Sequence, residues 1–315
     1  MPFDLNNRLV VGLASSALFD LSESDAVFRS QGEQEYRKYQ NENQDAPLKK
    51  GVAFPFIRRL LSLNKLNPKD PPVEVILLSR NDPDTGLRVM NSIEHYALPM
   101  TRAVFLQGTS PHIYIPAFNI ELFLSANPVD VKQAVMADYP AGQILEGSIK
   151  DDSSDMQLRI AFDFDGVIAD DEAETVYQGT RDLNDFHGHE VSKVDIPHNP
   201  GPLKSFLERL SKIQKLELKK QEEDASYIPV LRVSIVTARN APSHKRVINT
   251  MRHWGLMANE AFFMGGVEKS KVLEVMKPHM FFDDQRLHLE ASSSILPSVH
   301  VPFGVTNKTV LVDKK

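Results

Sequence analysis

Residues 158–171 read LRIAFDFDGVIADD, an apolar run that ends in two aspartates separated by one residue. Residues 160–162 are apolar without alternation, which is typical of a parallel strand covered on both faces. Gly166 then allows a tight exit from the sheet. The pattern predicts Asp163 and Asp165 at the carboxyl end of a buried strand, where open α/β sheets bind ligands. The alternative interpretation is a structural turn, because aspartate often bonds to its own backbone there.

The length of 315 residues suggests about two domains. The apolar fraction of 42% and the charged fraction of 25% are those of an ordinary globular protein. The net charge of −6 gives no general attraction to nucleic acid. Cysteine is absent, which excludes disulfides and thiolate chemistry. Because the sequence shows neither a secretory signal nor an apolar run of membrane-spanning length, we expect a cytoplasmic protein with no membrane partner.

Strand and helix patterns alternate along the first half of the chain. Apolar runs predict strands at 9–13, 73–78, 103–106 and 120–124. Helical spacing of apolar residues predicts helices at 27–40, 51–64, 83–96 and 129–137. Such an alternation favours an α/β fold with a parallel sheet.

The second half repeats the first. GPLKSFLERLSKIQ at 201–214 follows GVAFPFIRRLLSLN at 51–64, with Gly, Phe, Arg and Leu at matching places. After one short insertion, the stretch at 233–256 runs beside the stretch at 75–98, with Asn240 set on Asn81. We therefore predict two tandem Rossmann-like α/β domains, residues 1–150 and 151–315, joined near the loop-forming residues 146–155.

Only the second copy carries acids at the strand ends. In the first copy Leu13 and Ser15 stand where the second has Asp163 and Asp165, and Ser125 and Ala126 replace its Asp283 and Asp284. If the aspartates only formed turns, there would be no reason for one copy to keep four and the other none. The first domain is therefore predicted to be degenerate and the second catalytic.

Four groups of the second copy follow strand ends, which meet at one edge of a parallel sheet. They are Asp163 with Asp165, Thr237, Lys269, and Asp283 with Asp284. Clustered carboxylates repel one another, and oxygen donors alone favour Mg²⁺ over Zn²⁺. A divalent ion, a lysine and a hydroxyl suit a phosphate dianion, whose phosphorus a carboxylate could then attack.

In this order the four groups resemble the motifs of haloacid dehalogenase (HAD) superfamily phosphohydrolases. Longer stretches resemble the cytosolic 5'-nucleotidase I family over nearly the whole chain: VAFPFIRRLL, SRNDPDTGLRVMNSIEHY, TARNAPSHKRV, MRHWGL and PHMFFDDQRLHLE. The resemblance implies two HAD-type domains and hydrolysis of nucleoside 5'-monophosphates, with AMP favoured in the family's animal members. It also implies nucleotide metabolism as the setting.

Carried over by position, the resemblance makes Asp163 the nucleophile and Asp165 the residue that protonates the leaving ribose oxygen and then activates water. Phosphate is bound by Thr237, Ala238 and Lys269, with Lys271 as the alternative lysine. Asp163, the backbone carbonyl of Asp165, and Asp284 are the implied Mg²⁺ ligands. Asp283 is a further ligand or a partner of one.

Residues 171–200 have the length and polarity of a small cap inserted over the crevice. Phe186 and His187 in it are candidates for stacking on the base, the alternative being the core of the cap itself. Arg239 and Asn240 are candidates for touching substrate, although Asn240 could instead cap the helix that Pro242 begins. Two other functions stay open: a phosphatase of sugar phosphates, and a nucleotide-binding regulator with residual activity.

Overall fold

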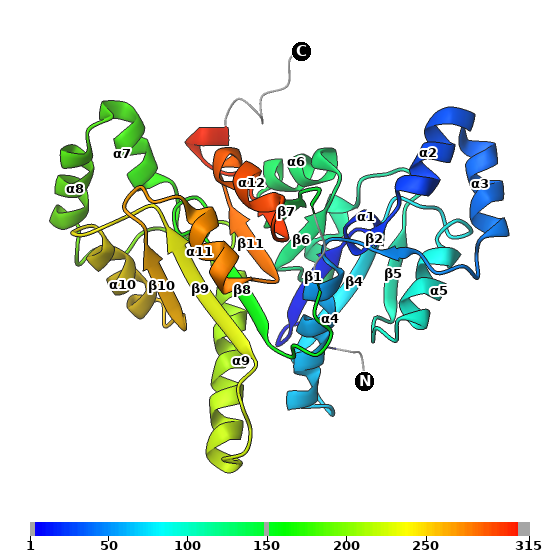
Figure 1. Cartoon of the computed structure of the whole chain (residues 1–315), viewed down its shortest axis with the longest axis horizontal. Coiled ribbons are helices and arrows are strands. Elements are labelled where there is room, and N and C mark those ends of the chain that lie inside the picture. The colour runs from blue at the N-terminus through cyan, green and yellow to red at the C-terminus, as the bar shows by residue number, and fades with distance from the viewer. Residues whose placement is uncertain (1–3, 148–150, 308–315) are drawn as a thin grey trace. The chain divides into compact units, whose positions relative to one another are not determined.

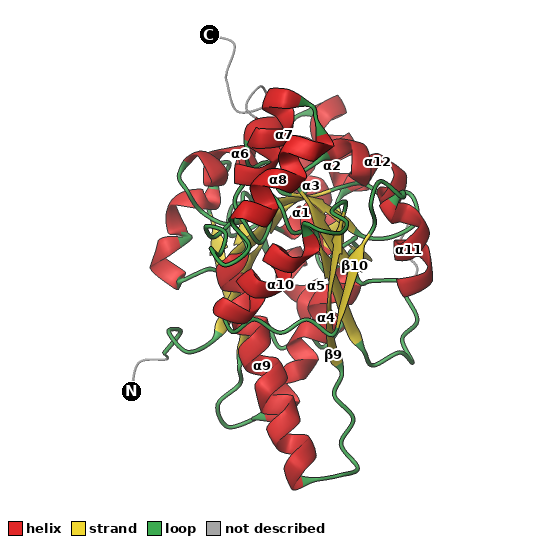
Figure 2. Ribbon diagram, turned by 90° about the vertical axis from the view of Figure 1, so that its left-hand side faces the viewer, coloured by secondary structure: helices red, strands yellow, loops and turns green. Residues whose placement is uncertain are grey.

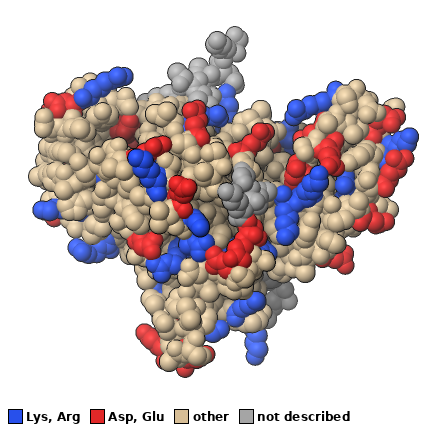
Figure 3. All heavy atoms as spheres, viewed as in Figure 1, with Lys and Arg blue, Asp and Glu red and all other residues tan. Residues whose placement is uncertain are grey.

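The computed structural model describes residues 4–147 and 151–307, and these form two compact units that divide between Ile144 and Leu145. Residues 148–150 of the predicted linker lie outside the described residues. Within the described ranges, no helix has both the length and the apolar character needed to cross a membrane. Basic and acidic side chains are interspersed over the face of these residues drawn in Figure 3.

The first unit contains a parallel five-stranded sheet, which confirms the α/β prediction for this half (Figure 1). Its spatial order is β5 (Arg102–Phe105), β4 (Val73–Ser79), β1 (Leu9–Leu13), β6 (Leu122–Ser125) and β7 (Ala141–Ile144). A separate antiparallel pair joins β2 (Phe19–Asp20) to β3 (Lys49–Lys50). The predicted strands were placed to within two residues at each end.

Predicted helices of the first unit were less accurate at their ends. The helices are α1 (Ser15–Leu18), α2 (Ser22–Gln31), α3 (Glu33–Glu42), α4 (Phe54–Ser62), α5 (Leu87–His95) and α6 (Pro128–Met136), with 3₁₀ turns η1 (Leu63–Leu66), η2 (Pro111–Tyr114) and η3 (Pro116–Phe118). The single helix expected at 27–40 is wrong, because Gly32 at φ +83° separates α2 from α3. The helix expected from residue 83 begins at Leu87, after a turn.

The second unit orders its strands as the first does. A parallel sheet runs β10 (Glu260–Phe263), β9 (Leu231–Thr237), β8 (Leu158–Phe162), β11 (Met280–Asp283) and β12 (Ser298–His300). Strand β8 thus takes the central place that β1 has in the first unit. Its Ile160, Ala161 and Phe162 are fully buried, as the unbroken apolar run predicted.

The helices of the second unit are α7 (Glu172–Thr180), α8 (Leu183–Ser192), α9 (Lys204–Glu223), α10 (His244–His253), α11 (Lys269–Met276) and α12 (Arg286–Ser293), followed by the 3₁₀ turn η4 (Val305–Asn307). Figures 1 and 2 show α7 and α8 side by side at one end of this unit, while α9 extends from the opposite end. The stretch at 171–200, expected as a small cap insertion, contains α7 and α8. Helices α2 and α3 occupy the matching part of the first unit.

Candidate active site

The nucleophile candidate stands where β8 ends. The Asp163 amide donates to the carbonyl of Phe282 in β11 (2.8 Å), and its Oδ1 accepts from the amide of Phe164 (2.7 Å). The stacked rings of Phe162 and Phe282, 5.1 Å apart, fix the two strand ends beside each other. The side chain of Asp163 is buried and lines a cavity of about 320 Å³, a volume within the range of small-molecule sites.

Lys269 is the lysine that reaches this carboxylate. As the first residue of α11 it is buried, and its Nζ lies 2.8 Å from Asp163 Oδ2 and 2.7 Å from Asp283 Oδ2. Burial acts to lower the pKa of Lys269, but the two carboxylates outweigh it, so the pKa is raised and the ammonium stays charged. Lys271, two residues further along the helix, is exposed.

Asp283 and Asp284 follow on β11 and have different surroundings. Asp283 is fully buried. Its carboxylate accepts hydrogen bonds from Lys269 Nζ and from the amide of Gln285 (2.8 Å), and it lies 3.2 Å from His288 Nδ1. Asp284 accepts on Oδ2 from Thr306 Oγ1 (2.9 Å), while its Oδ1 is buried without a hydrogen-bond partner among the described residues.

The pKa values reflect this crowding of acids. Burial raises the pKa of Asp163 to about 7 and that of Asp284 to about 9, and neighbouring carboxylates add to both shifts. Burial also acts to raise the pKa of Asp283, but the charge of Lys269 outweighs it and the pKa is lowered. The site therefore favours an additional positive charge, which would let all three acids ionise.

Acidic and imidazole ligand atoms come close enough here for a metal ion. Atoms of Asp163, Asp283 and His288 lie within 4.8 Å of one another, and the buried Oδ1 of Asp284 lacks a partner among the described side chains. Gly166 at φ +70° adjoins that carboxylate, since a Cβ there would lie 2.7 Å from Asp284 Cγ. These oxygen donors fit a hard divalent cation.

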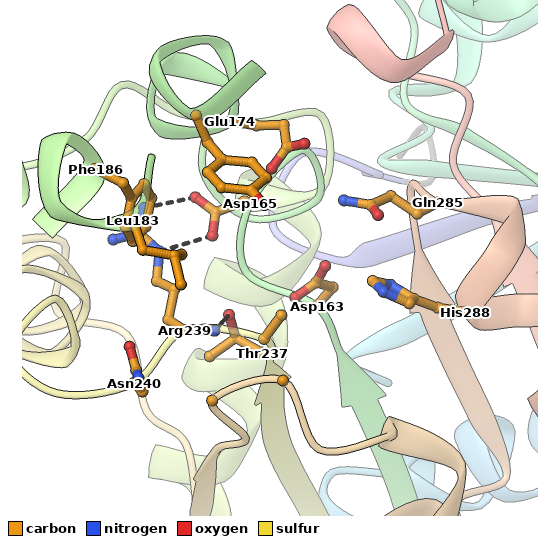
Figure 4. Close-up of a pocket in the computed structure, with 14 residues that line it drawn as sticks. Asp163, Asp165, Glu174, Leu183, Phe186, Thr237, Arg239, Asn240, Gln285 and His288 are labelled. Atoms are coloured by element: carbon orange, nitrogen blue, oxygen red, sulfur yellow. Dashed lines mark hydrogen bonds and ion pairs between the residues drawn. The ribbon is translucent and has the colours of Figure 1, made fainter. Parts of the chain in front are cut away.

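Asp165 lines the same cavity, but its carboxylate contacts Arg239 and not Lys269 or the other acids. Arg239 holds it in a two-pronged ion pair, with Nε donating to Oδ2 (2.7 Å) and Nη2 to Oδ1 (2.6 Å), as Figure 4 shows. This carboxylate is thus taken up by Arg239, and the family resemblance implies the backbone carbonyl of Asp165, not its side chain, as a metal ligand. The sequence suggested Arg239 as a candidate for touching substrate, yet its guanidinium is engaged by acids.

The phosphate-binding candidates lie at the end of β9. Thr237 is buried, and its Oγ1 accepts from the amide of Arg239 (3.2 Å), whereas Ala238 is exposed. Both line the cavity, as does the loop containing Gly265 and Gly266. This wall offers a hydroxyl and open backbone rather than bulky side chains.

The helix pair α7 and α8 closes another side of the cavity. Phe186 lines it and packs beside Arg239, the guanidinium carbon lying 5.4 Å from the ring centroid. His187 is not among the lining residues, and its Nε2 lies 2.9 Å from Asn240 Oδ1. The expected capping role of Asn240 is wrong for its side chain: α10 has Ser243 at its N-cap, and only the backbone carbonyl of Asn240 accepts there.

Three residues of the site were not predicted from the sequence. Glu190 on α8 and His198 are buried beside Arg239, and His288 on α12 reaches Asp283. The internal repeat could have indicated Glu190, because the matching residue of the first half is Gln40 and both halves thus carry a long polar side chain at this position. No comparable pattern marked His198 or His288, whose neighbours come from separate elements.

A family model and a curated relative both match this chain. A family model described as 5'-nucleotidase matches residues 1–308. Human "Cytosolic 5'-nucleotidase 1B" is 32% identical over 295 residues, which are 92% of this chain and 48% of that protein. The chain thus spans about half the length of this curated relative. No solved structure matches the chain significantly.

Proposed function

This chain belongs to the 5'-nucleotidase family, and on that premise we propose that its second unit hydrolyses nucleoside 5'-monophosphates to nucleoside and phosphate. The carrying observation is the buried Asp163 carboxylate 2.8 Å from Lys269, at the wall of a cavity that also holds Thr237. An ammonium so placed neutralises a phosphate oxygen and reduces the repulsion between that phosphate and an attacking carboxylate.

In the first step an oxygen of Asp163 attacks phosphorus, and the bond from phosphorus to the ribose oxygen breaks. Asp165, which takes up a proton from solvent and gives up one of its two bonds to Arg239 before the step, gives that proton to the leaving oxygen, so the nucleoside departs neutral. In the second step Asp165 takes a proton from water, whose oxygen bonds to phosphorus as the aspartyl phosphate bond breaks. Inorganic phosphate leaves, and both aspartates return to their starting protonation states.

Phosphate is held by residues that follow two strands. Lys269 supplies charge, Thr237 supplies its hydroxyl, and the exposed backbone at Ala238 supplies an N–H. The nucleoside then extends toward α7 and α8, where Phe186 offers an aromatic wall. Asn240 also lines the cavity and is a candidate for contacting the far end of the substrate, and His187, which contacts Asn240, is a candidate through it.

Magnesium is the cofactor that we propose. Asp163, Asp284 and the backbone carbonyl of Asp165 would hold it, and the partnerless oxygen of Asp284 supports that assignment. When bound, Mg²⁺ neutralises a phosphate oxygen and the crowded carboxylates. Asp283 supports the site by fixing Lys269 and His288, which both contact it.

We assign the catalysis to residues 151–315, with α7 and α8 as their cap, and assign none to residues 1–150. The first unit has Leu13, Ser15, Ser125 and Ala126 at the positions of the four acids. It is therefore a degenerate HAD-type domain. Because the human relative is named cytosolic, a cytoplasmic location is part of the same proposal and is tested by cell fractionation.

A phosphate-release screen tests the function. The purified chain is incubated with nucleoside 5'-monophosphates and with sugar phosphates, each with Mg²⁺ and with EDTA. We expect Mg²⁺-dependent release from nucleotides. Preferential release from sugar phosphates would replace the substrate class, and nucleotide binding without turnover would identify a regulator.

A further inference from the structure

A buried group of charges joins the helix pair to the catalytic crevice. Glu190 on α8 is 1% exposed and lies between two arginines, with Oε2 paired to Arg239 and Oε1 accepting from Arg246 Nη1 (2.8 Å). Arg239 continues to Asp165 through its two-pronged ion pair. We call Asp165, Arg239 and Glu190 the charged triad.

Each nitrogen of the Arg239 guanidinium has a hydrogen-bonding partner. Nε and Nη2 donate to Asp165, Nη1 donates to Glu190, and Nη2 also lies 3.3 Å from His198 Nε2. The guanidinium also packs by the rings of Phe164 and Phe186, its carbon 5.5 and 5.4 Å from their centroids. An arginine held this way has one orientation, and it passes that orientation to the carboxylate of Asp165.

The first unit shows which of these contacts the fold requires. Arg88, which matches Arg246 in the repeat, donates from Nη1 to Gln40 and from Nε to the carbonyl of Ala46 (3.0 Å). Arg246 donates likewise to Glu190 and to the carbonyl of Ile196 (2.9 Å). These contacts attach the helix pair in both units.

A second anchor is also shared. Asn91 Nδ2 donates to the carbonyl of Gln44, and Asn249 Nδ2 donates to that of Val194, both at 3.0 Å. Both anchors therefore attach a helix pair in a unit that has the catalytic acids and in a unit that lacks them.

The charged triad is not shared. With the ends of β4 and β9 aligned, Ser15, Asn81 and Gln40 of the first unit stand at the positions of the triad. Asn81 meets the helix pair through Tyr36 (3.4 Å), a neutral hydrogen bond. A helix pair of this kind thus folds onto its sheet without the triad, and the triad occurs only where the acids do.

We propose that Glu190 and Arg239 are positioning residues: α8 holds Arg239 through Glu190, and Arg239 holds the carboxylate of Asp165 in the orientation needed for proton transfer. The inference rests on the proposed function, because it assigns Asp165 the two proton transfers. Loss of Glu190 would leave the metal ligands and Lys269 intact while Asp165 loses its fixed direction.

Leaving groups distinguish this role from a purely structural one. A ribose alkoxide needs a proton to depart, so both steps on a nucleotide depend on Asp165. Nitrophenolate departs from p-nitrophenyl phosphate without a proton, so only hydrolysis of the aspartyl phosphate then depends on Asp165. A misdirected Asp165 would thus accumulate phosphorylated enzyme with the aryl substrate.

The test uses E190Q in the full chain with Mg²⁺. Gln40 shows that glutamine at this place accepts a bond from the matching arginine, so the helix pair should stay attached. We expect kcat for the best nucleotide to fall by about 100-fold with KM nearly unchanged. With p-nitrophenyl phosphate we expect a rapid burst of nitrophenolate, a slow steady rate, and phosphorylated protein in quenched samples.

Asn249→Ala is the matched control, because it removes a shared anchor without touching Arg239. It should show neither the burst nor the selective loss of kcat. R239K, which keeps the charge but loses the two-pronged pair, repeats the test if E190Q does not fold.

If the wild-type chain hydrolyses nucleotides and the E190Q or R239K variant has a kcat within about twofold of the wild-type value, this inference is overturned and the proposed function stands. A loss confined to KM, or equal losses with both substrates and no phosphorylated protein, would also overturn it. A wild-type chain inactive on every phosphate ester would remove the proposed function and this inference together.

Discussion

The two units share a strand order, a helix pair and its anchors, but they differ at the ends of their central strands. Around β8 four acids gather, whereas the matching places around β1 hold Leu13, Ser15, Ser125 and Ala126. The first unit therefore separates residues needed to build this fold from residues that serve chemistry. Arg88 and Arg246 belong to the first class, and on our proposal Arg239 belongs to the second.

In the first unit a buried acid is paired locally. Asp130 on α6 is buried and accepts from Arg80 Nε (2.8 Å) and from Ser110 Oγ (3.0 Å). One acid with one arginine has no like-charge repulsion to relieve, so nothing in this pair calls for a cation. The acids around Asp163 differ because burial and mutual repulsion raise the pKa of two of them.

The largest expected effect is on turnover. Asp163→Asn should lower kcat by about 10⁴-fold or more, because the amide is a poor nucleophile. A control change in the first unit, Ser15→Ala at the position that matches Asp165, should leave kcat as it is. Steady-state kinetics on both variants, with circular dichroism to confirm folding, provides the measurement; a well-folded Asp163→Asn variant with wild-type turnover would remove Asp163 as nucleophile.

The next effect compares the arginine anchor of the second unit with that of the first. Arg246→Met should destabilise by about 3–5 kcal/mol, because it removes a cation from the buried Glu190 and from Glu172. Arg88→Met should cost about 1–3 kcal/mol, because its partner Gln40 is neutral. Urea denaturation of each variant measures the difference. Equal costs would mean that the charge at Glu190 adds nothing to the attachment.

Magnesium should act on one unit only. At about 100 times its dissociation constant it should add about 2.7 kcal/mol to the stability of the second unit, because the unfolded chain lacks the site. Asp284→Asn should abolish the shift in melting temperature, and Asp130→Asn in the first unit should not. A Mg²⁺ shift that survives Asp284→Asn would contradict the ligand assignment.

A smaller effect concerns how the free energy of unfolding falls at acid pH. The pKa of Glu190 is lowered to about 2, since hydrogen bonding and charge from His198 and Arg239 outweigh burial. Because the folded pKa is depressed, this stabilisation is complete above the ordinary value near 4.5 and is lost as pH falls toward about 2. Between about pH 6 and pH 3, E190Q should therefore lose about 2 kcal/mol less than wild type. Identical acid dependence in urea titrations would contradict this.

The sequence predicted those parts of the site that depend on strand ends. Unbroken apolar runs located β8 and β11, and a parallel sheet necessarily brings their carboxyl ends together, which placed Asp163 near Asp283. The sequence left Lys269 and Lys271 as alternatives, because the exposure of each side chain on α11 depends on how that helix packs. Glu190 and His288 were missed for the same reason: their partners come from elements whose packing no local pattern encodes.

The repeat alignment was also displaced by one residue in a loop. It set Asn240 on Asn81, but the contacts pair Asn240 with His187 and Asp82 with Arg37 in the corresponding places. The shared Asn-x-Pro spacing misled the alignment, since it outweighed the common ends of β4 and β9.

Gly166 has a consequence for how such a site is lost. Its missing side chain leaves the space that the Asp284 carboxylate fills, since a Cβ there would lie 2.7 Å from Asp284 Cγ. The first unit has Ser16 and Ala126 at these two positions, so a side chain is present at one and an acid is absent at the other. The two positions are thus coupled by volume: in the second unit a side chain at 166 and the carboxylate at 284 would occupy the same space. By the same geometry, building an acid at 126 into the first unit would also call for glycine at 16, so the two changes have to be made together.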